Sequence, residues 1–378
     1  MPQAAFIEVD RGPGGAPARF VAPQRRVTAW EPASVPGALA ALEAALAEGA
    51  WIAGHASYEL GYLFEARLAP LLPGGRRLPL LDFGVFADGP GPARPVAPGG
   101  RLGPFRPAWD AARYAAAFDR VADYIRAGDA YQVNLTLPMR GRWAGDPAAL
   151  RAALAAVQPV GHGALVRFGE AALLSRSPEL FFALDGRGGI EARPMKGTAP
   201  RDPDPGRDAA AAANLAADPK NRAENLMIVD LLRNDIARIA EIGSVAVPEL
   251  FAIESYATVH QMVSRVTGRI LPGTGLTAIL AALFPCGSVT GAPKVRAMEI
   301  IRELEPWPRE AYCGAIGWAA PDGRAAFNVA IRTLVLYPGG EAVLNVGGGV
   351  VADSTAPAEY EESLWKARFT ELSRPISG

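Results

Sequence analysis

Lysine is rare in this chain, and most of its lysines stand where chemistry is possible. Of the 38 basic residues only Lys196, Lys220, Lys294 and Lys366 are lysine, and the other 34 are arginine. Arginine stays protonated and cannot act as a nucleophile, whereas the pKa of a lysine falls readily when its amine is desolvated. Three of the four lie in dense motifs: RPMKGT (193–198), TGAPKVRAME (290–299) and EYEESLWK (359–366). A few lysines can persist by chance, so the count shows only where a site should be sought.

The last motif has the spacing of a binding face on a helix. Glu359, Glu362 and Lys366 stand at i, i+3 and i+7, which places them on one side of a helix over two turns. The carboxylates could hold Mg²⁺, and the lysine could hold a substrate carboxylate. Spacing alone favours a solvated face with a Glu362–Lys366 pair worth roughly a few tenths of a kcal/mol. Upstream, the glycines of VGGGVV (346–351) indicate either an anion-binding nest of amides or a bulge or tight turn.

Further acidic residues lie in AENLMIVDLLRNDIARI (223–239), which has the pattern of a largely buried helix. Carboxylates buried in such a helix need an ion pair, hydrogen bonds or a metal. For Asp230, Arg233 and Asp235 a structural ion network is the preferred interpretation. Glu224, near the start of the helix, is the better candidate for a Mg²⁺ ligand.

The segment FPCGSVTGAPKVRAMEII (284–301) places Thr290 and Lys294 around the start of a predicted helix. A helix N-terminus with a nearby lysine can bind an anion. An ordinary capped helix with its apolar side chains in the core explains the same pattern.

The elements that must position these residues form a mixed pattern. A stretch rich in Gly and Pro (84–107) separates a short N-terminal part, 1–105, from a longer part, 106–378. A helix is predicted from Asp110 to Gly128, followed by a strand over 131–137 with Gln132 on its polar face. Further strands are predicted at 164–168, 171–174, 179–184, 312–319, 325–337 and 342–346, with a polar loop carrying RPMKGT, a loop or short helix over 199–222, and a last helix over 356–372. Helices and strands do not alternate regularly and no GxGxxG motif follows a strand, so an α+β fold with much antiparallel sheet is expected and a dinucleotide-binding fold is excluded.

Composition limits the class of protein. The 378 residues are 50% hydrophobic and 20% charged, which is typical of a globular protein with a sizeable core. A net charge of -1 without a basic stripe argues against nucleic acid as a partner. No signal peptide and no apolar run of about 20 residues is evident, so a cytoplasmic protein with no membrane partner is expected. Cys286, Cys313 and His260 are more typical of buried core residues than of a thiol–imidazole pair.

Taken together, the motifs resemble those of the chorismate-utilising enzymes. The matching segments are SRSPELF (175–181), RPMKGT, AENLMIVDLLRNDIARI, FPCGSVTGAPKVRAMEII, YCGAIGW (312–318), FNVAIRTL (327–334), GGGVVADS (347–354) and EYEESLWK. They occur in the family's order over about 106–378. WIAGHASYELGYLFE (51–65) resembles part of the family's N-terminal region, which is otherwise shortened and lacks the motif for feedback control by tryptophan.

The resemblance implies a fold of large antiparallel sheets packed as a sandwich with helices outside, and binding of chorismate with Mg²⁺. It implies that Glu224 and Glu362 hold the metal, with Glu359 nearby or bound through water. It further assigns the two substrate carboxylates to Tyr312, Arg332, Lys366 and the amides of Gly347, Gly348 and Gly349, and the remainder of the substrate pocket to Thr198, His260, Thr290 and Gln132.

Two positions distinguish branches of the family. Members that add water resemble this chain but carry a lysine base where Gln132 stands, so hydroxylation is disfavoured. Members that make anthranilate resemble the 193–198 segment but have a small residue at the position of Lys196. The branch that the chain resembles makes 4-amino-4-deoxychorismate, for 4-aminobenzoate and folate, with Lys196 as nucleophile and Glu179 as general acid.

A partner and two alternatives follow from the same resemblance. No glutaminase nucleophile motif is present, so ammonia is expected from a separate glutaminase subunit. The runner-up activity is formation of anthranilate and pyruvate from chorismate. From another class, the chain could be a degenerate subunit that only binds chorismate or a glutaminase; joint retention of the carboxylates, Arg332 and the lysines argues against it.

Overall fold

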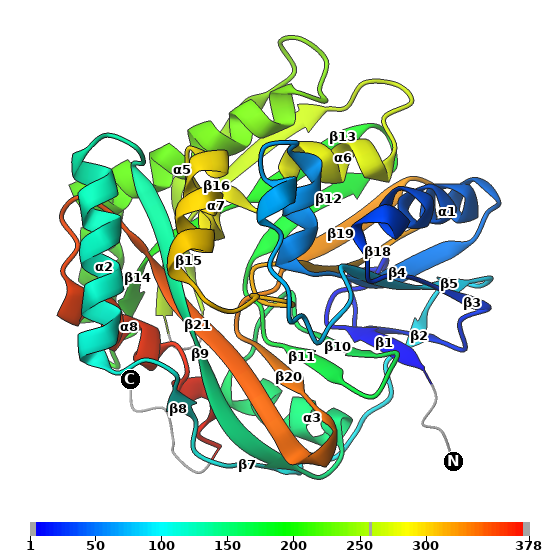
Figure 1. The fold of residues 1–378 in the computed structure, drawn as a ribbon, viewed down its shortest axis with the longest axis horizontal. Coiled ribbons are helices and arrows are strands. Elements are labelled where there is room, and N and C mark those ends of the chain that lie inside the picture. Colours follow the sequence, from blue (N-terminus) through cyan, green and yellow to red (C-terminus); the bar gives the residue numbers. More distant parts are fainter. Residues whose placement is uncertain (1–4, 257–258, 373–378) are drawn as a thin grey trace.

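The computed structural model describes residues 5–256 and 259–372, and its strands form two large antiparallel sheets (Figure 1). The eleven-stranded sheet has the order β17 (Gly291–Ala292), β9 (Gln132–Ala144), β21 (Glu341–Val350), β20 (Thr333–Leu336), β11 (Ala172–Ser175), β10 (Ala164–Arg167), β1 (Phe6–Val9), β2 (Ala18–Val21) and β6 (Gly91–Pro92), with β7 (Arg101–Leu102) and β8 (Arg106–Pro107) paired to β9. The ten-stranded sheet has the order β14 (Met195–Pro200), β16 (Val259–Arg269), β13 (Gly189–Arg193), β12 (Leu180–Asp185), β19 (Arg324–Val329), β18 (Ala315–Ala319), β4 (Trp51–Ala56), β5 (Leu81–Phe86) and β3 (Arg25–Ala29), with β15 (Ala246–Ser255) paired to β16.

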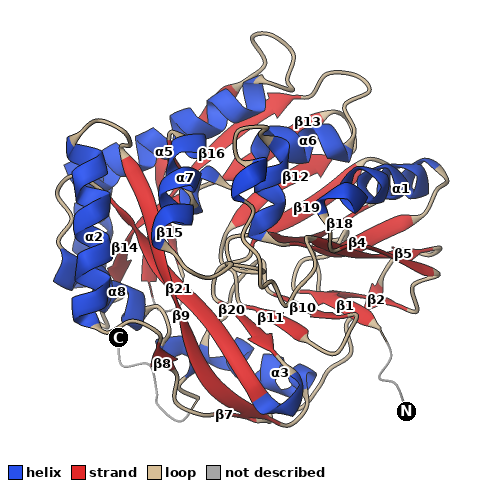
Figure 2. Ribbon diagram, viewed as in Figure 1, coloured by secondary structure: helices blue, strands red, loops and turns tan. Residues whose placement is uncertain are grey.

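The helices lie on the outside of the sheets (Figure 2). They are α1 (Val35–Ala47), α2 (Ala111–Arg126), α3 (Pro147–Val157), α4 (Pro205–Ala217), α5 (Pro219–Ala237), α6 (Leu276–Leu283), α7 (Lys294–Leu304) and α8 (Ala356–Trp365). Helices α1, α4 and α5 contact the ten-stranded sheet, and α2, α3, α7 and α8 contact the eleven-stranded one. A hydrophobic cluster fills the space between the sheets, with Ile7 and Phe20 from one sheet and Ala53 and Trp318 from the other. The predicted sandwich of antiparallel sheets with helices outside is therefore confirmed.

The predicted elements are found with some changes of length. The helix expected from Asp110 is α2; the Asp110 carboxylate accepts the N–H of Arg113 at 2.8 Å, and Tyr114 and Phe118 are buried. The strand expected over 131–137 continues to Ala144, because its pairing with β21 runs from Val133 on to Arg142. A thirteen-residue helix, α4, occupies much of 199–222.

The expectation that RPMKGT forms a polar loop is wrong. Residues 195–200 form strand β14, whose backbone pairs with β16. The register shifts between Met195 and Thr198, and Gly197 has a φ of +81° at this bulge. A bulge changes the direction of the side chains within it, and Lys196 lies within this bulge.

Strands from the first 105 residues extend both sheets. Strand β1 pairs with β10 in the eleven-stranded sheet, and β4 pairs with β18 in the ten-stranded one. The division near residue 105 stays a prediction, although strands from both sides of it share hydrogen bonds.

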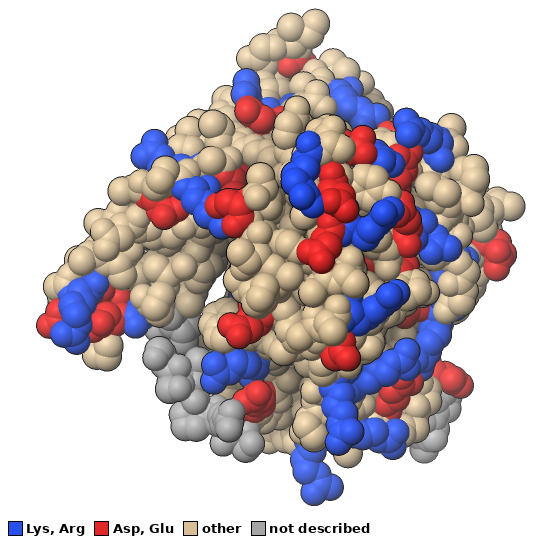
Figure 3. Space-filling model, turned by 60° about the vertical axis from the view of Figure 1, so that its left-hand side comes forward, with Lys and Arg blue, Asp and Glu red and all other residues tan. Residues whose placement is uncertain are grey.

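The helices and the surface charges bear on whether the chain could be a membrane protein or a nucleic-acid-binding protein. In the described residues no helix is both long and apolar enough to cross a membrane. On the face drawn in Figure 3, acidic and basic side chains are intermingled rather than gathered into one basic field.

Candidate functional site

The site is built where the edges of the two sheets meet. Lys196 comes from β14 of the ten-stranded sheet, and Gln132 begins β9 of the eleven-stranded sheet. The Lys196 Nζ donates a hydrogen bond to the Gln132 Oε1 at 3.3 Å. Gln132 is fully buried, and its Nε2 has no partner within the described chain. An unpaired buried amide is costly, so this group is poised to bind something polar beside Lys196.

The surroundings of Lys196 favour a neutral amine. Burial lowers the pKa of Lys196, and the positive charge of Lys366 lowers it further. The carboxylates of Glu224, Glu179 and Glu362 oppose this shift. The net direction is downward, which increases the fraction of amine that can act as a nucleophile.

Glu179 is the buried carboxylate of the site. It is 4% exposed and immediately precedes β12. Burial raises the pKa of Glu179 to about 7. Three groups oppose this shift: the Ser288 hydroxyl, which donates to the Glu179 Oε1 at 2.7 Å, and the nearby charges of Lys196 and Arg332. A carboxyl group with this pKa is able to carry a proton near neutral pH, as a general acid must.

Arg332 supplies a cation that no described residue neutralises by direct contact. Its backbone has a φ of +50°, a left-handed conformation that is uncommon outside glycine. Within residues 5–256 and 259–372 no hydrogen bond or ion pair of its guanidinium is found. Burial lowers the pKa of Arg332, and the charge of Glu179 opposes this shift. A half-buried, unpaired guanidinium is suited to a bidentate contact with a carboxylate.

The three predicted metal ligands come from two helices. Glu224 lies on α5, which packs against the ten-stranded sheet, and Glu359 and Glu362 lie on α8, which packs against β21. Burial raises the pKa values of Glu224 and Glu359, and the charge of Glu362 raises both further. These carboxylates are thus close enough to repel one another, and a bound cation would reduce that repulsion.

Two of these carboxylates have protein partners. Ser354 donates a hydrogen bond to Glu359 at 2.7 Å. Lys366 forms an ion pair with Glu362 at 2.8 Å. Burial raises the pKa of Glu362, but the charge and hydrogen bond of Lys366 outweigh it, so the net shift is downward. In the part of the chain that is described, no three His, Cys, Asp or Glu side chains lie close enough to surround a metal ion. The set of hard oxygen donors fits Mg²⁺ in its chemistry.

The three glycines upstream of α8 form neither a nest nor a bulge, so both of those expectations are wrong. Gly347, Gly348 and Gly349 continue β21 in unbroken register with β9, and none has a positive φ. Their partners Thr136 and Asn134 direct their backbone N–H groups away from β21. In an antiparallel ladder, when one residue of an opposite pair points its N–H away from the partner strand, the other residue does the same. The amides of Gly347 and Gly349 therefore point away from β9.

Glycine is needed at position 347, because a Cβ there would lie 2.4 Å from the backbone carbonyl oxygen of Leu135. At Gly348 and Gly349 a Cβ would meet the ends of the Glu359 and Gln132 side chains, at 2.7 Å from the Glu359 Oε2 and 2.8 Å from the Gln132 amide carbon. The Nζ of Lys366 donates to the carbonyl of Gly347 at 2.8 Å. Strand β21, helix α8 and strand β9 therefore meet at one place.

The other predicted site residues are engaged by protein groups. His260 is 3% exposed, and its two ring nitrogens bond to Ser255 at 2.8 Å and Asp208 at 2.9 Å. Thr198 donates to Gln261 at 2.9 Å. These bonds leave little hydrogen-bonding capacity of His260 for a substrate.

Thr290 and Tyr312 are also buried. The Thr290 hydroxyl donates to the Cys286 carbonyl at 2.9 Å, and its own carbonyl accepts the N–H of Asn134. Tyr312 is 6% exposed, and burial raises its pKa well above the ordinary value. Thr290 therefore holds the backbone of Cys286 and Asn134 beside the site.

Lys294 does not form an anion site at the start of its helix, because protein groups occupy its amine. Its Nζ lies 2.6 Å from Asp235 and 2.9 Å from the carbonyl of Leu283. Arg233 pairs with Asp230 at 2.6 Å. The structural role preferred for Asp230, Arg233 and Asp235 is confirmed, although they form two separate ion pairs rather than one network.

Sequence reasoning missed two participants. Ser288 lies inside GSVTGAPK, where the sequence pattern indicates only the helix that follows, and its bond to Glu179 joins segments 109 residues apart. Asp353, in the turn before α8, forms an ion pair with Lys220 at 3.1 Å. The rarity of lysine was a signal for Lys220, but nothing in the sequence pointed to its partner.

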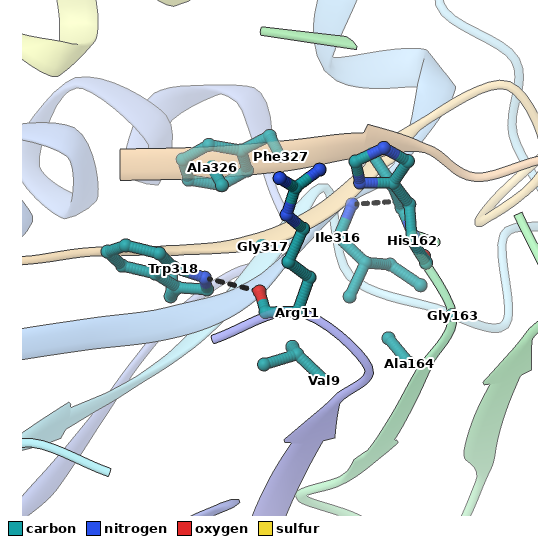
Figure 4. A pocket seen from close by; sticks show the side chains of 11 residues that line it. Val9, Arg11, His162, Gly163, Ala164, Ile316, Gly317, Trp318, Ala326 and Phe327 are labelled. Carbon is teal, nitrogen blue, oxygen red and sulfur yellow. Dashed lines mark hydrogen bonds between the residues drawn. The ribbon is translucent and has the colours of Figure 1, made fainter. Parts of the chain in front are cut away.

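A separate small pocket lies between the two sheets and is lined by none of the predicted site residues (Figure 4). Its lining includes Val9, Arg11, His162, Trp318 and Phe327. Burial lowers the pKa of His162 to about 4, with a further contribution from the charge of Arg11. The imidazole is therefore neutral near pH 7.

Comparison with known proteins places the chain in a family. Residues 90–371 match the model of the chorismate binding enzymes. The chain is 47% identical over 253 residues to aminodeoxychorismate synthase component 1 of Klebsiella aerogenes, which covers 67% of this chain and 56% of that protein. It is 44% identical over 248 residues to anthranilate synthase component 1 1 of Haloarcula marismortui, covering 66% and 50%.

A solved structure agrees with this assignment. Anthranilate synthase component I from Streptococcus pneumoniae has a TM-score of 0.81 and 25% identity, and the match covers 98% of this chain and 93% of that one. The curated relatives are longer, and the match spans only about half of their length. The chain belongs to the family of chorismate-binding enzymes.

Proposed function

We propose that the chain makes 4-amino-4-deoxychorismate from chorismate and ammonia. The observation that carries this proposal is the desolvated Lys196 amine, 3.3 Å from Gln132 and within electrostatic reach of Glu179. A nucleophile with a lowered pKa beside a carboxyl group with a raised pKa is the pair that a two-step displacement requires. Similarity to an aminodeoxychorismate synthase component 1 supports the same activity.

In the first step the Lys196 amine attacks C2 of the substrate ring and the double bond shifts. Glu179 gives its proton to the 4-hydroxyl group, which leaves as water. In the second step ammonia forms a bond to C4, the double bond shifts back and the Lys196 amine is expelled. The lysine must be unprotonated to begin, and its lowered pKa serves that requirement.

Binding groups lie around this pair. Arg332, Lys366 and the amides of Gly347 and Gly349 are assigned to the substrate carboxylates. Tyr312, Thr290, Thr198 and His260 line or support the pocket, and Gln132 offers its unpaired amide. Glu224 and Glu362, with Glu359, would hold Mg²⁺, and a bound Mg²⁺ would neutralise the ring carboxylate of the substrate.

Gln132 also bears on what the site adds to the ring. An amide cannot take a proton from water, so it does not serve as the base that hydroxylation needs. Ammonia is nucleophilic without such a base. We assign its supply to a separate glutaminase subunit, which suits the designation component 1 of the relatives.

Anthranilate formation is the second candidate, because relatives at 44% identity bear the name anthranilate synthase. The two activities differ in the carbon that ammonia attacks. A covalent bond between Lys196 and C2 blocks that carbon and directs ammonia to C4, whereas direct attack of ammonia at C2 leads to anthranilate.

Product analysis decides between them. The purified chain is incubated with chorismate, Mg²⁺ and an ammonium salt at mildly alkaline pH, and the products are separated by chromatography. The expected product is 4-amino-4-deoxychorismate, which an added lyase converts to 4-aminobenzoate. Fluorescent anthranilate as the main product would contradict the proposal.

A further inference from the structure

A chain of buried hydrogen-bonding groups ends at the Glu179 carboxyl group. The Ser288 Oγ lies 2.7 Å from the Glu179 Oε1, and the Cys286 Sγ lies 3.2 Å from the Ser288 Oγ. All three residues are at least 95% buried. The other oxygen, Oε2 of Glu179, accepts no hydrogen bond from any residue in 5–256 or 259–372.

The number of protons fixes the direction of this chain when the carboxyl group is ionised. A serine hydroxyl has one proton to donate, and an ionised carboxylate can only accept. The Ser288 proton is therefore directed at Glu179. The Cys286 thiol, which can donate weakly, must then donate to the Ser288 oxygen.

The backbone of Glu179 is held as well. Its N–H donates to the Ser177 hydroxyl at 3.2 Å, and its carbonyl accepts the N–H of Val329 at 3.1 Å. With the backbone and Oε1 held, only Oε2 is unbonded. That oxygen is the one available to carry and deliver a proton.

We propose that Ser288, supported by the Cys286 thiol, is the positioning residue that orients the Glu179 carboxyl group for proton delivery to the substrate. The inference rests on the proposed function, in which Glu179 is the general acid. When the proton leaves Oε2 and the C4–O bond of the substrate breaks, the carboxylate that remains keeps the Ser288 hydrogen bond. Hydrogen bonds to a charged oxygen are stronger than those to a neutral one, so this contact favours release of the proton.

The charged and titratable groups that face Glu179 come from several elements. The cations are Lys196 on β14 and Arg332, which precedes β20, and the neutral Cys286 thiol lies next to Ser288. Lys196, Arg332 and Ser288 each lower the pKa of Glu179 against the effect of burial. Removing the Ser288 hydroxyl alone therefore raises the pKa of Glu179 while the two cations remain.

The test is the pH dependence of product formation by Ser288→Ala at a fixed concentration of unprotonated ammonia. The acid must be protonated, so ionisation of Glu179 limits the rate on the alkaline side. We expect that limb to move up by about one pH unit and the maximal rate to fall about tenfold. Ser288→Thr keeps a hydroxyl and is expected to retain the wild-type limb.

A matched control separates this role from a structural one. Ser57 is fully buried and donates to the carbonyl of Pro79 at 2.7 Å, far along the chain from the site. Ser57→Ala is expected to lower the melting temperature without moving the alkaline limb. Infrared difference spectra of wild type against Glu179→Gln follow the protonated Glu179 band directly, which gives a readout that does not depend on activity.

The outcomes are distinct. An upward shift in Ser288→Ala, with a smaller one in Cys286→Ala, supports the proposal. An unchanged limb and an unchanged infrared titration in a folded Ser288→Ala would overturn it while leaving Glu179 as the acid. A fully active Glu179→Gln would instead remove the general acid from the proposed function.

Discussion

Lys220 and Asp353 form an ion pair of 3.1 Å that joins the start of α5 to the turn before α8. Their side chains are 49% and 62% exposed, so the pair lies at the rim of the carboxylate cluster. The charge of Lys220 lowers the pKa of Glu224 and of Glu362, against the effect of burial. Lys220 thus acts on the carboxylates that are proposed to bind Mg²⁺.

Removal of this charge is expected to strengthen Mg²⁺ binding. Lys220 repels a second cation near the same carboxylates, so Lys220→Met should lower the dissociation constant of Mg²⁺ about two- to fivefold at low salt. Isothermal titration with Mg²⁺ measures this directly. Stability should hardly change, because exposed ion pairs contribute little.

Arg233→Met is the matched control for this charge, because Arg233 lies on the same helix in an exposed pair with Asp230. It should leave the Mg²⁺ affinity unchanged. Weaker Mg²⁺ binding in Lys220→Met would contradict the electrostatic interpretation and indicate that the pair holds α5 against the turn.

Replacement of Lys196 tests the covalent step. Lys196→Ala and Lys196→Arg should both lose amination by on the order of a thousandfold or more, because neither side chain can act as the nucleophile. In the wild type without ammonia, intact-protein mass spectrometry should detect an adduct of chorismate less one water. Circular dichroism checks that the variants are folded. Folded, inactive variants with no adduct ever trapped on the wild type would leave Lys196 only a binding role.

Gln132→Lys tests what the site adds to the ring. The Gln132 Oε1 lies 3.3 Å from the Lys196 Nζ, so a lysine at position 132 would place two amines side by side. Each would depress the pKa of the other, and the second amine would supply a base for water. We expect amination to fall and a hydroxylated product, isochorismate, to appear on chromatography. Gln132→Leu serves as the control, since it removes the amide without adding a base. Equal product patterns from the two variants would argue against a base at this position.

The buried carboxyl group of Glu179 should cost stability. Its pKa of about 7 in the folded protein exceeds the ordinary 4.5, so the folded state retains a proton that the unfolded state releases. Stability from this group is therefore complete below about pH 4.5 and is lost as the pH rises towards about 7. Glu179→Gln should raise the free energy of unfolding by about 2–3 kcal/mol above pH 7 and weaken its pH dependence.

Glu305→Gln provides the contrast. Glu305 and Arg309 form an ion pair of 2.7 Å with both side chains 1% exposed. Breaking one partner of a buried pair is expected to cost about 3–5 kcal/mol. Denaturant unfolding at several pH values measures both variants. A stabilised Glu305→Gln or a destabilised Glu179→Gln above pH 7 would show that the carboxylate environments have been interpreted wrongly.

Much of the local structure was already present in the sequence. Periodic apolar residues predicted α2 and α5, and the alternation of 131–137 placed Gln132 at the start of a strand. Such patterns are local, because burial of one face depends on the spacing of neighbouring residues. The order and spacing of the motifs were sufficient to indicate the family.

The meeting of these residues was decided by the tertiary structure. Lys196 and Gln132 are 64 residues apart and belong to different sheets, so no periodicity relates them. The bulge at Gly197 and the bond from Ser288 to Glu179 depend on strands and turns that pair across the molecule. The triple glycine lies in a regular strand because β9 lies beside it, and that pairing spans more than 200 residues. Sequence spacing determines on which face of its helix or strand a residue lies, but long-range packing determines which faces meet. The shifted pKa values arise only when those faces exclude water from between them.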